Sequence, residues 1–256
     1  MKKLCQSKIL KNEQLADQYW KLVFDCPEIA NEALPGQFIE VYFDHSLKIF
    51  PRPFSIAKVE HDALELIYKV IGSQTEIMAS WKPGETVQIL GPLGNFFVIS
   101  DDTKTHILVG GGVGLAPMVF MSEVLKEKNF LFFCGGRNGR EYFPEVHDPV
   151  RRIISTDDGS VGFHGNVVQC LEKEIAAIET PVVIYACGPE KMCEALKYFG
   201  EKHNIPVQIS METIMACGMG LCQGCALKTY DENGNDKISL VCKDGPIFKG
   251  EEINFG

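Results

Sequence analysis

Residues 217–225 read Cys-Gly-Met-Gly-Leu-Cys-Gln-Gly-Cys, and a further cysteine follows after sixteen more residues. The spacing C-x4-C-x2-C with a distant fourth cysteine is typical of plant-type [2Fe–2S] sites. Three thiolates then converge from one tight loop, and the glycines let the backbone turn amide N–H groups toward the sulfur atoms. We therefore predict a [2Fe–2S] cluster whose ligands are Cys217, Cys222, Cys225 and Cys242.

Structural zinc is the main alternative, because it also takes four cysteines. Zinc ribbons favour two short cysteine pairs, and only Cys222 and Cys225 form one here. A one-electron cluster cannot by itself carry out two-electron organic chemistry. The rest of the chain is therefore expected to hold a flavin or another redox centre.

The composition of the 256 residues is that of a soluble globular protein, with 45% hydrophobic and 23% charged residues. A net charge of −9 argues against nucleic acid or an anionic membrane as a partner. The longest uncharged run, residues 107–121, is shorter than the ~20 residues of a membrane span and is broken by glycines. With no export signal at the start, we expect a cytoplasmic protein whose ten cysteines are reduced.

Residues 1–102 have the pattern of antiparallel β-structure. Short β-rich runs are separated by turn dipeptides such as Pro35-Gly36 and Pro83-Gly84. About six strands fit a small closed barrel, with one short helix near 74–81. The expected strands are 4–10, 19–25, 38–43, 54–59, 64–70 and 86–90.

From residue 105 apolar strands alternate with helical patterns, which implies a parallel sheet covered on both faces. The strands are expected at 105–109, 130–134, 152–156, 182–186 and 207–210, and the helices at 118–128, 167–177 and 191–203. The predicted fold is therefore multi-domain, β plus α/β. It comprises an antiparallel β-barrel (1–102), a parallel α/β nucleotide-binding domain (103–210) and a small cluster-binding segment (211–256).

Three pieces of the predicted barrel suit a flavin nucleotide. Arg52-Pro53-Phe54-Ser55 opens a strand, and an arginine fork can bind a pyrophosphate while a serine hydroxyl bonds a flavin edge. Residues 67–69 end another strand, and residues 72–75 lead into a helix whose N-terminus suits a phosphate. Taken alone, an Arg–Pro between strands is more often a turn. The order of the pieces on one barrel favours the flavin.

A glycine-rich stretch after the first α/β strand suits a dinucleotide. Gly112-x-Gly114-x-x-Pro117 is similar to the dinucleotide fingerprint, with proline in the first turn of a helix. The next strand ends in Cys-Gly-Gly-Arg at 134–137 and not in an acidic residue, so a conventional ribose contact is not expected.

Two further loops follow strands of this sheet, where open α/β sheets bind ligands. A solvated turn and an ordinary helix start explain them equally well. The residues concerned are Asp157, Asp158, Cys187, Gly188 and Pro189.

With the barrel, RPFS, GGGVGLAP, ACGP and the cysteine loop in this order, the chain resembles the ferredoxin-reductase superfamily. Over essentially its full length it resembles the electron-transfer subunits of class 1B dihydroorotate dehydrogenases. The most specific match is residues 215–225 followed by 242–248. That family binds FAD in the barrel and a [2Fe–2S] cluster in the C-terminal segment, and pairs with an FMN-containing catalytic subunit.

The resemblance implies an electron path from dihydroorotate, through the partner's FMN, the cluster and FAD, to NAD+, in de novo pyrimidine (UMP) biosynthesis. It implies no catalytic acid or base in this chain, and a heterotetramer of two copies of each chain. Gln74 departs from the family's usual glycine. The implied contacts are Arg52, Pro53, Phe54, Ser55, Ile67, Tyr68, Lys69, Gln74 and Thr75 for FAD, and Gly112, Gly114, Pro117, Asp157, Asp158, Cys187, Gly188 and Pro189 for NAD.

Two rival functions remain open. The flavin subunit of an electron-bifurcating NADH-dependent ferredoxin:NADP oxidoreductase, or of a cytosolic hydrogenase, looks similar across all three segments. The bifurcating type commonly carries Asp at the first ligand position, so Cys217 favours the pyrimidine pathway. A zinc-stabilised binding module without redox activity is the rival from another class. NADP is also open, because Arg137 could meet a 2′-phosphate, although an arginine in a loop is more often simply a surface residue.

Overall fold

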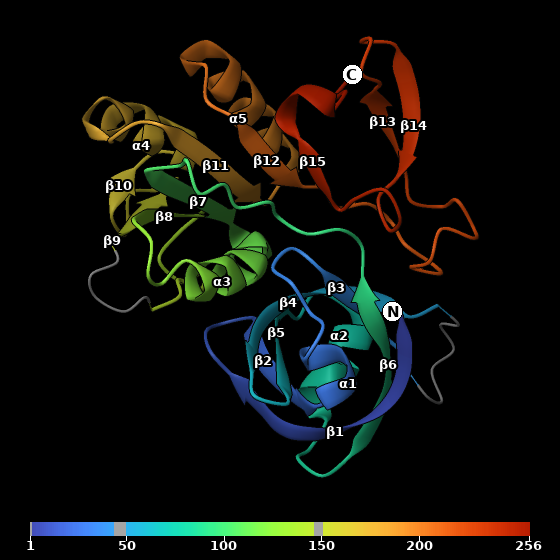
Figure 1. Cartoon of the computed structure of the whole chain (residues 1–256). Coiled ribbons are helices and arrows are strands. Elements are labelled where there is room, and N and C mark those ends of the chain that lie inside the picture. The colour runs from blue at the N-terminus through green and yellow to red at the C-terminus, as the bar shows by residue number, and fades with distance from the viewer. Residues whose placement is uncertain (1, 44–49, 146–150) are drawn as a thin grey trace.

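The computed structural model describes residues 2–43, 50–145 and 151–256. A β-barrel, an α/β sheet and a C-terminal segment that lies against both make up these residues (Figure 1). The predicted fold class is confirmed. Within the described ranges, no helix is both long enough and apolar enough to cross a membrane.

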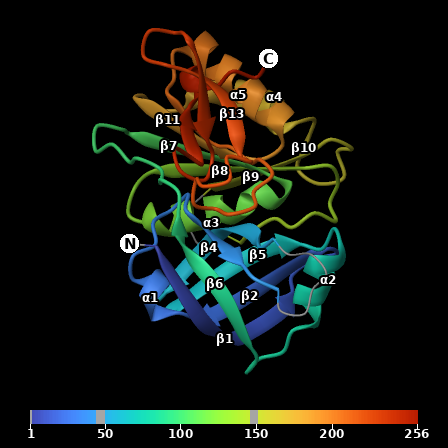
Figure 2. The ribbon, with the colours of Figure 1, turned by 90° about the vertical axis from the view of Figure 1, so that its right-hand side faces the viewer.

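Six antiparallel strands close the barrel in the order 1-2-5-4-3-6: β1 (Lys3–Gln14), β2 (Tyr19–Asp25), β3 (Phe38–Val41), β4 (Arg52–Glu60), β5 (Ala63–Lys69) and β6 (Thr86–Leu93). Side chains alternate along each strand, and the inward set, which includes Leu22, Ile39 and Leu66, is fully buried. Two helices, α1 (Pro27–Ala30) and α2 (Ser73–Ser80), lie on opposite sides of the barrel (Figure 2).

All six expected barrel strands are present, and the largest difference is in β1. It runs four residues past Leu10, because a bulge between Ile9 and Lys11 lets one strand pair first with β6 and then with β2. The helix α1 was not predicted. At four residues it is too short to show a helical period.

Five parallel strands form most of a seven-stranded sheet in the order 10-9-8-7-11-12-15: β7 (Thr105–Gly111), β8 (Phe130–Gly136), β9 (Arg151–Thr156), β11 (Val182–Cys187) and β12 (Val207–Ser210). A two-residue strand, β10 (Phe163–His164), extends one edge. All five predicted strands of this sheet are confirmed.

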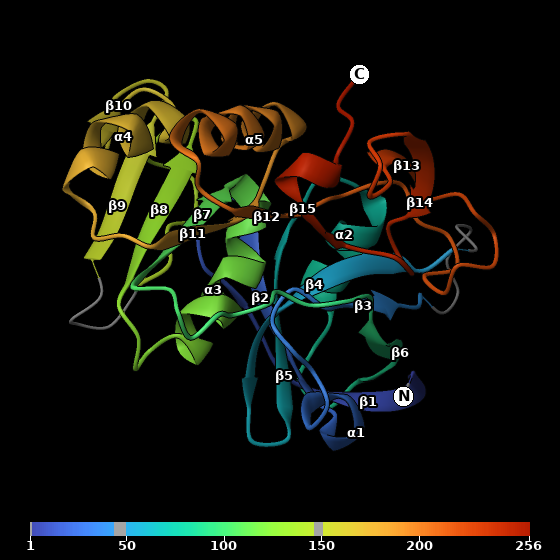
Figure 3. The same ribbon diagram turned by 45° about the horizontal axis from the view of Figure 1, so that its top comes forward.

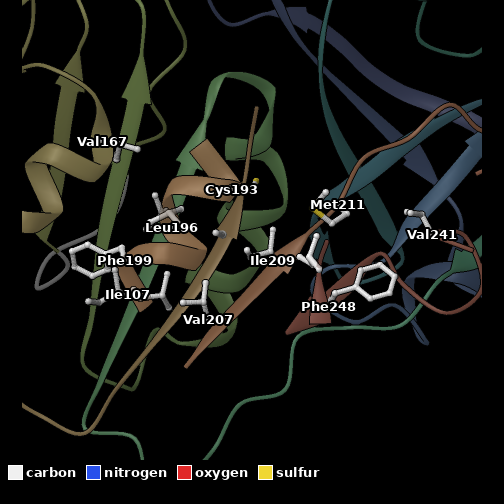
Figure 4. Packing of buried hydrophobic residues seen from close by; sticks show 14 of the residues in the cluster. Ile107, Val167, Cys193, Leu196, Phe199, Val207, Ile209, Met211, Val241 and Phe248 are labelled. Atoms are coloured by element: carbon white, nitrogen blue, oxygen red, sulfur yellow. The ribbon is translucent and has the colours of Figure 1, made fainter. Parts of the chain in front are cut away.

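Helices cover both faces of the sheet. Leu108 and Tyr185 pack toward α3 (Leu115–Val124), which follows the one-turn η1 (Gly112–Gly114). Ile107 and Ile184 pack on the other face, toward the remaining helices (Figure 4). Those helices are α4 (Val167–Glu174) with η2 (Ile175–Ala177), and α5 (Glu190–His203).

The C-terminal segment contains three strands that were not predicted. An exposed hairpin of β13 (Ala226–Tyr230) and β14 (Asp236–Leu240) is followed by β15 (Ile247–Lys249) and η3 (Gly250–Glu252). Antiparallel pairing of β15 with β12 builds the segment into the sheet edge (Figure 3).

Asn95 fastens the end of the barrel to the C-terminal segment. Its side-chain amide donates to the carbonyl oxygens of Asp244 and Ile247, at 3.1 and 2.8 Å, and accepts from the Ile247 N–H at 2.8 Å. Its own backbone N–H donates to Gly245 at 2.7 Å. One side chain therefore holds residues 244–247 in place.

Asn95→Ala should loosen this segment without unfolding the barrel. Three lost hydrogen bonds cost about 2–4 kcal/mol, so local opening should increase by about 30-fold or more. Hydrogen exchange of the peptide covering residues 243–249 measures this directly. Exchange should stay unchanged for Asn31→Ala, which alters an exposed residue. Equal exchange in both variants would contradict the role of Asn95.

Candidate functional site

The four predicted cysteines come together as two pairs. Sulfur atoms of Cys225 and Cys242 lie 3.2 Å apart, and the Cys222 N–H donates to the Cys217 sulfur at 3.4 Å. Of these four described residues, no three have sulfur atoms all within 4.8 Å of one another. A single zinc ion at about 2.3 Å from each sulfur would require that closeness for all four. Two separated pairs fit the two iron atoms of a [2Fe–2S] cluster.

Backbone N–H groups surround the sulfur atoms. Gly220 donates to Cys242 at 3.1 Å, and Cys222 donates to Cys217 at 3.4 Å. Burial alone would raise the pKa of Cys217, but the N–H groups of Cys222 and Met219 hold it at about 6. The loop therefore favours a thiolate at its first ligand position.

The thiol of Cys242 is harder to ionise than that of Cys217, so the pair Cys225 and Cys242 depends more on a bound cation. Burial, the hydrogen bond with Cys225 and that neighbour's charge raise the pKa of Cys242 to about 12. Both residues of this pair are almost fully buried. Positive iron would offset the cost of ionising two adjacent buried thiols.

The four cysteines differ in exposure: Cys222 is exposed, Cys217 is half-buried, and Cys225 and Cys242 are buried. Leu221, next to Cys222 in the chain, is 77% exposed, and Ile214, three residues before Cys217, is 89% exposed. Cys225 and Cys242 instead pack in one apolar cluster with Phe38 and Leu93 of the barrel. One side of the site is open to another molecule, and the other side is inside this chain.

Contact between the loop and the barrel is close at Gly218, whose φ is +62°. A Cβ atom there would lie 2.7 Å from Cγ of Glu40 on β3, so glycine is required for both reasons. Glu40 is fully buried, and its carboxylate oxygens have no hydrogen-bond partner among the described residues. Burial and the nearby Cys217 raise the pKa of Glu40 to about 8, against the opposing charge of Arg52.

The predicted flavin strand lies next to this contact. On β4, Pro53 pairs with Glu40 and Ser55 pairs with Phe38, so only one strand separates residues 52–55 from the cluster loop. Neighbouring strands are about 4.8 Å apart. The structure thus places the predicted FAD strand beside the predicted cluster.

The side chain of Tyr68 lies on the other side of β5 from the side chains of Ile67 and Lys69. Its ring is fully buried in the barrel core, its hydroxyl donates to Asn12 at 3.2 Å, and it meets Phe54 edge-on. Only its backbone can reach a flavin. Ile67 and Lys69 point to the opposite side, toward the α/β sheet, where Lys69 Nζ is 3.4 Å from Glu141.

At the start of α2 the two predicted polar residues have separate roles. The Thr75 hydroxyl accepts from the Gly72 N–H at 3.1 Å and donates to the Gly72 carbonyl, so it caps the helix. Gln74 is buried with its Oε1 atom unpartnered among the described residues, while Nε2 reaches the Phe50 carbonyl at 3.4 Å. A buried free acceptor at this position is consistent with a missing donor group.

The two glycine-containing loops predicted for the dinucleotide touch each other. A Cβ atom on Gly114 would collide with the carbonyl group of Cys187 and come within 2.7 Å of the Gly188 Cα. Pro117 is buried in the first turn of α3, and Pro189 precedes α5. The loops at residues 112–114 and 187–189 therefore form one surface at the carboxyl ends of β7 and β11.

A cleft of about 380 Å³ opens over this surface. Four predicted residues line it: Lys69, Gly112, Asp157 and Pro189. Asp158 does not line it, because its carboxylate accepts from Ser160 N and Oγ within its own turn. Arg137, considered above for a 2′-phosphate, also lines it, and the polar lining residues that the sequence did not reveal are Tyr19, Glu141, Asn166 and Lys191.

A larger hollow of about 930 Å³ lies at the amino-terminal ends of the parallel strands, between Thr103, Pro181 and Pro206. It contains none of the predicted site residues. Ligands of open α/β sheets bind at the carboxyl ends of the strands, so the smaller cleft is the candidate nucleotide site.

Comparison with known proteins agrees with this geometry. The family model for the iron–sulfur cluster binding domain of dihydroorotate dehydrogenase B matches residues 212–254, which contain all four cysteines. The fold is similar to that of an NADH-dependent reduced ferredoxin-NADP oxidoreductase studied for flavin-based electron bifurcation. That match has a TM-score of 0.84 and 28% identity over 98% of this chain and 90% of the other. A ferredoxin reductase in carbazole 1,9a-dioxygenase shares the fold alone, with a TM-score of 0.67 and 20% identity over 81% and 69% of the two chains.

Sequence relatives cover almost the whole chain. The electron transfer subunit of dihydroorotate dehydrogenase B (NAD(+)) from Caldanaerobacter subterraneus subsp. tengcongensis is 32% identical over 98% of both chains. Its counterpart from Enterococcus faecalis is 35% identical over 96% of both chains. The predicted family is confirmed: this chain belongs to the dihydroorotate dehydrogenase B (NAD(+)) electron transfer subunits.

Proposed function

We propose that this chain passes electrons from the FMN of a dihydroorotate dehydrogenase catalytic subunit, through a [2Fe–2S] cluster and FAD, to NAD+, in de novo pyrimidine biosynthesis. The arrangement of the four cysteines carries this proposal, since Cys222 is exposed while Cys225 and Cys242 are buried in the same apolar cluster as barrel residues. The relatives named above support dihydroorotate as substrate and NAD+ as acceptor. A cluster site that needs four reduced cysteines supports a reducing, cytoplasmic location.

Three units are proposed: an FAD-binding barrel (1–102), an NAD-binding α/β domain (103–210) and a cluster-binding segment (211–256). Each cofactor has its own group of contact residues. Cluster ligands are Cys217, Cys222, Cys225 and Cys242. FAD contacts are Arg52, Pro53, Phe54, Ser55, Ile67, Tyr68 (through its backbone), Lys69, Gln74 and Thr75. NAD contacts are Gly112, Gly114, Pro117, Asp157, Cys187, Gly188 and Pro189; Asp158, whose carboxylate accepts from Ser160 within its own turn, is not retained.

The chain's own residues bind and orient, and none is proposed as an acid or base toward dihydroorotate. When bound, the cluster supplies one-electron transfer and the flavin exchanges single electrons for a hydride. The Arg52 guanidinium offers two parallel N–H groups to a pyrophosphate, and the Ser55 hydroxyl can bond a flavin edge. Phe38 and Leu93 exclude water from the space between the cluster loop and the barrel.

The catalytic partner is proposed to dock on the surface formed by Ile214, Leu221 and Cys222. Leu221 directly precedes the exposed Cys222, and Ile214 lies three residues before Cys217; large exposed apolar side chains of this kind are typical of an interaction site. The FMN of the partner would then face the exposed Cys222. A heterotetramer of two copies of each chain is proposed from the family resemblance.

The bifurcating oxidoreductase stays as a second candidate, because its structure has the same fold over nearly the whole chain. Cys217 at the first ligand position favours the dihydroorotate pathway. Co-purification of this chain with its native partner, followed by assay with dihydroorotate and NAD+, tests the two. An FMN-containing partner and NADH production are expected. A large bifurcating or hydrogenase subunit would overturn the proposal.

Cys225→Ala should abolish the visible absorption of the cluster and leave FAD bound, because the ligand is lost from a site outside the flavin strand. Iron content and flavin content per chain measure the two effects separately. Cys134→Ala changes a cysteine that is equally buried, but in the α/β sheet, and should keep its iron. Unchanged iron in the Cys225 variant would show that the ligand assignment is wrong.

Arg52→Ala should weaken FAD binding by about 10- to 100-fold, the effect of removing charge-assisted hydrogen bonds to a phosphate. Equilibrium dialysis of the flavin measures the dissociation constant. Arg140→Ala, at an exposed arginine outside both proposed sites, is the control and should bind FAD normally. Full flavin retention in the Arg52 variant would remove its pyrophosphate role.

Leu221→Asp should weaken association with the catalytic subunit by about tenfold or more, because a charge is buried at the centre of the proposed interface. Surface plasmon resonance or analytical ultracentrifugation gives the dissociation constant. The same change at Leu4, which is 58% exposed on β1 of the barrel, should have no effect. Similar affinity of both variants would place the partner elsewhere.

A further inference from the structure

Arg137 stands where dinucleotide-binding sheets distinguish the two nicotinamide coenzymes. In such sheets an acidic residue about 20 residues past the glycine loop bonds the ribose 2′-hydroxyl of NAD, and an arginine nearby accommodates the 2′-phosphate of NADP. Here the strand after the glycine loop, β8, ends in Gly136 and is followed by Arg137, which lines the cleft. By residue type alone, this position points to NADP.

The carboxylate of Glu141 is hydrogen-bonded to the guanidinium group of Arg137. Its Oε1 atom accepts from Nε of Arg137 at 3.2 Å and from Nη2 at 3.1 Å. The arginine side chain is 72% exposed and the glutamate side chain only 7%. The buried carboxylate is therefore the fixed partner, and the arginine folds back onto it.

The barrel holds Glu141 in place from the other side. The Tyr19 hydroxyl donates to its Oε2 atom, and Lys69 Nζ lies 3.4 Å from the same oxygen. Burial by itself would raise the pKa of Glu141, but the bonds from Tyr19 and Arg137 and the charge of Lys69 bring it below its ordinary value. The group is thus a carboxylate at neutral pH, fixed by three donors from two parts of the fold.

The remaining charges at this end of the cleft also disfavour a phosphate. Asp157 follows β9 and lines the cleft, and its N–H donates to the Gly136 carbonyl at 3.1 Å, so this acidic residue lies beside the end of β8. A ribose hydroxyl can donate to such a carboxylate, whereas a phosphate dianion is repelled by it. Among the cleft-lining residues that the structure describes, the other cations are Lys69, which is paired with Glu141, and Lys191, at the start of α5 beside Pro189.

We propose that Glu141 is the residue that makes this site prefer NAD(H) over NADP(H), by engaging Arg137 and adding negative charge where a 2′-phosphate would lie. This inference rests on the proposed function, because it assigns the coenzyme class of the same cleft. Arg137 becomes available to a 2′-phosphate only when the carboxylate is removed.

Glu141→Gln tests the proposal while keeping the shape of the side chain. We expect the ratio of kcat/KM for NADH to that for NADPH, measured with ferricyanide as acceptor, to fall by about tenfold or more, mainly through a lower KM for NADPH. Adding Arg137→Ala to this variant should restore the original ratio. Glu145→Gln, at another glutamate paired with an arginine in the same loop but outside the cleft, should leave the ratio unchanged.

Binding of ADP-ribose and of 2′-phospho-ADP-ribose gives a second readout that needs no turnover. Calorimetry on the flavin-loaded chain should show the phosphorylated ligand gaining affinity in Glu141→Gln and losing that gain in the double variant. A selectivity equal to that of the native chain in both assays would overturn the proposal. Absence of NADH oxidation by the native chain would instead count against the proposed function, and the binding ratio alone would then decide the role of Glu141.

Discussion

Four thiol groups that must ionise side by side are the constraint on which the rest of this structure depends. Burial makes each ionisation costly and each added thiolate raises the cost of the next, and together they bring the pKa of Cys242 to about 12. In the cluster loop, backbone N–H groups donate to the cysteine sulfur atoms. Directing these groups toward sulfur requires tight turns, and hence glycine. A loop of this kind has little core of its own, so β15 and Asn95 fasten it to the sheet and the barrel.

Close backbone packing also occurs next to the two other proposed cofactor sites. Gly218 lets the cluster loop approach β3, and Gly114 lets the glycine loop approach Cys187, each at a distance no side chain would tolerate. These close approaches bring the cluster loop, the flavin strand and the dinucleotide cleft to neighbouring surfaces. Electron transfer along such a series depends on short separations, and the family to which the chain belongs has that task.

Local patterns were enough to predict the barrel strands, the parallel strands and the four cysteines. The alternation of Leu64, Leu66 and Tyr68 along β5 also indicates that the Tyr68 ring lies inside the barrel, although Tyr68 was predicted as a flavin contact. The division of the cysteines into two pairs, however, depends on how a loop folds around its own N–H groups. Tyr19 and Glu141 meet across 122 residues of chain, and no local pattern marks such a pair.

The most direct test is whether the cysteine loop binds a [2Fe–2S] cluster. Electron paramagnetic resonance of the dithionite-reduced chain, with iron and acid-labile sulfide determined on the same sample, measures this. The account predicts the rhombic spectrum of a reduced [2Fe–2S] cluster, with iron and sulfide in equal amounts. A colourless chain that contains zinc and gives no such spectrum would contradict it.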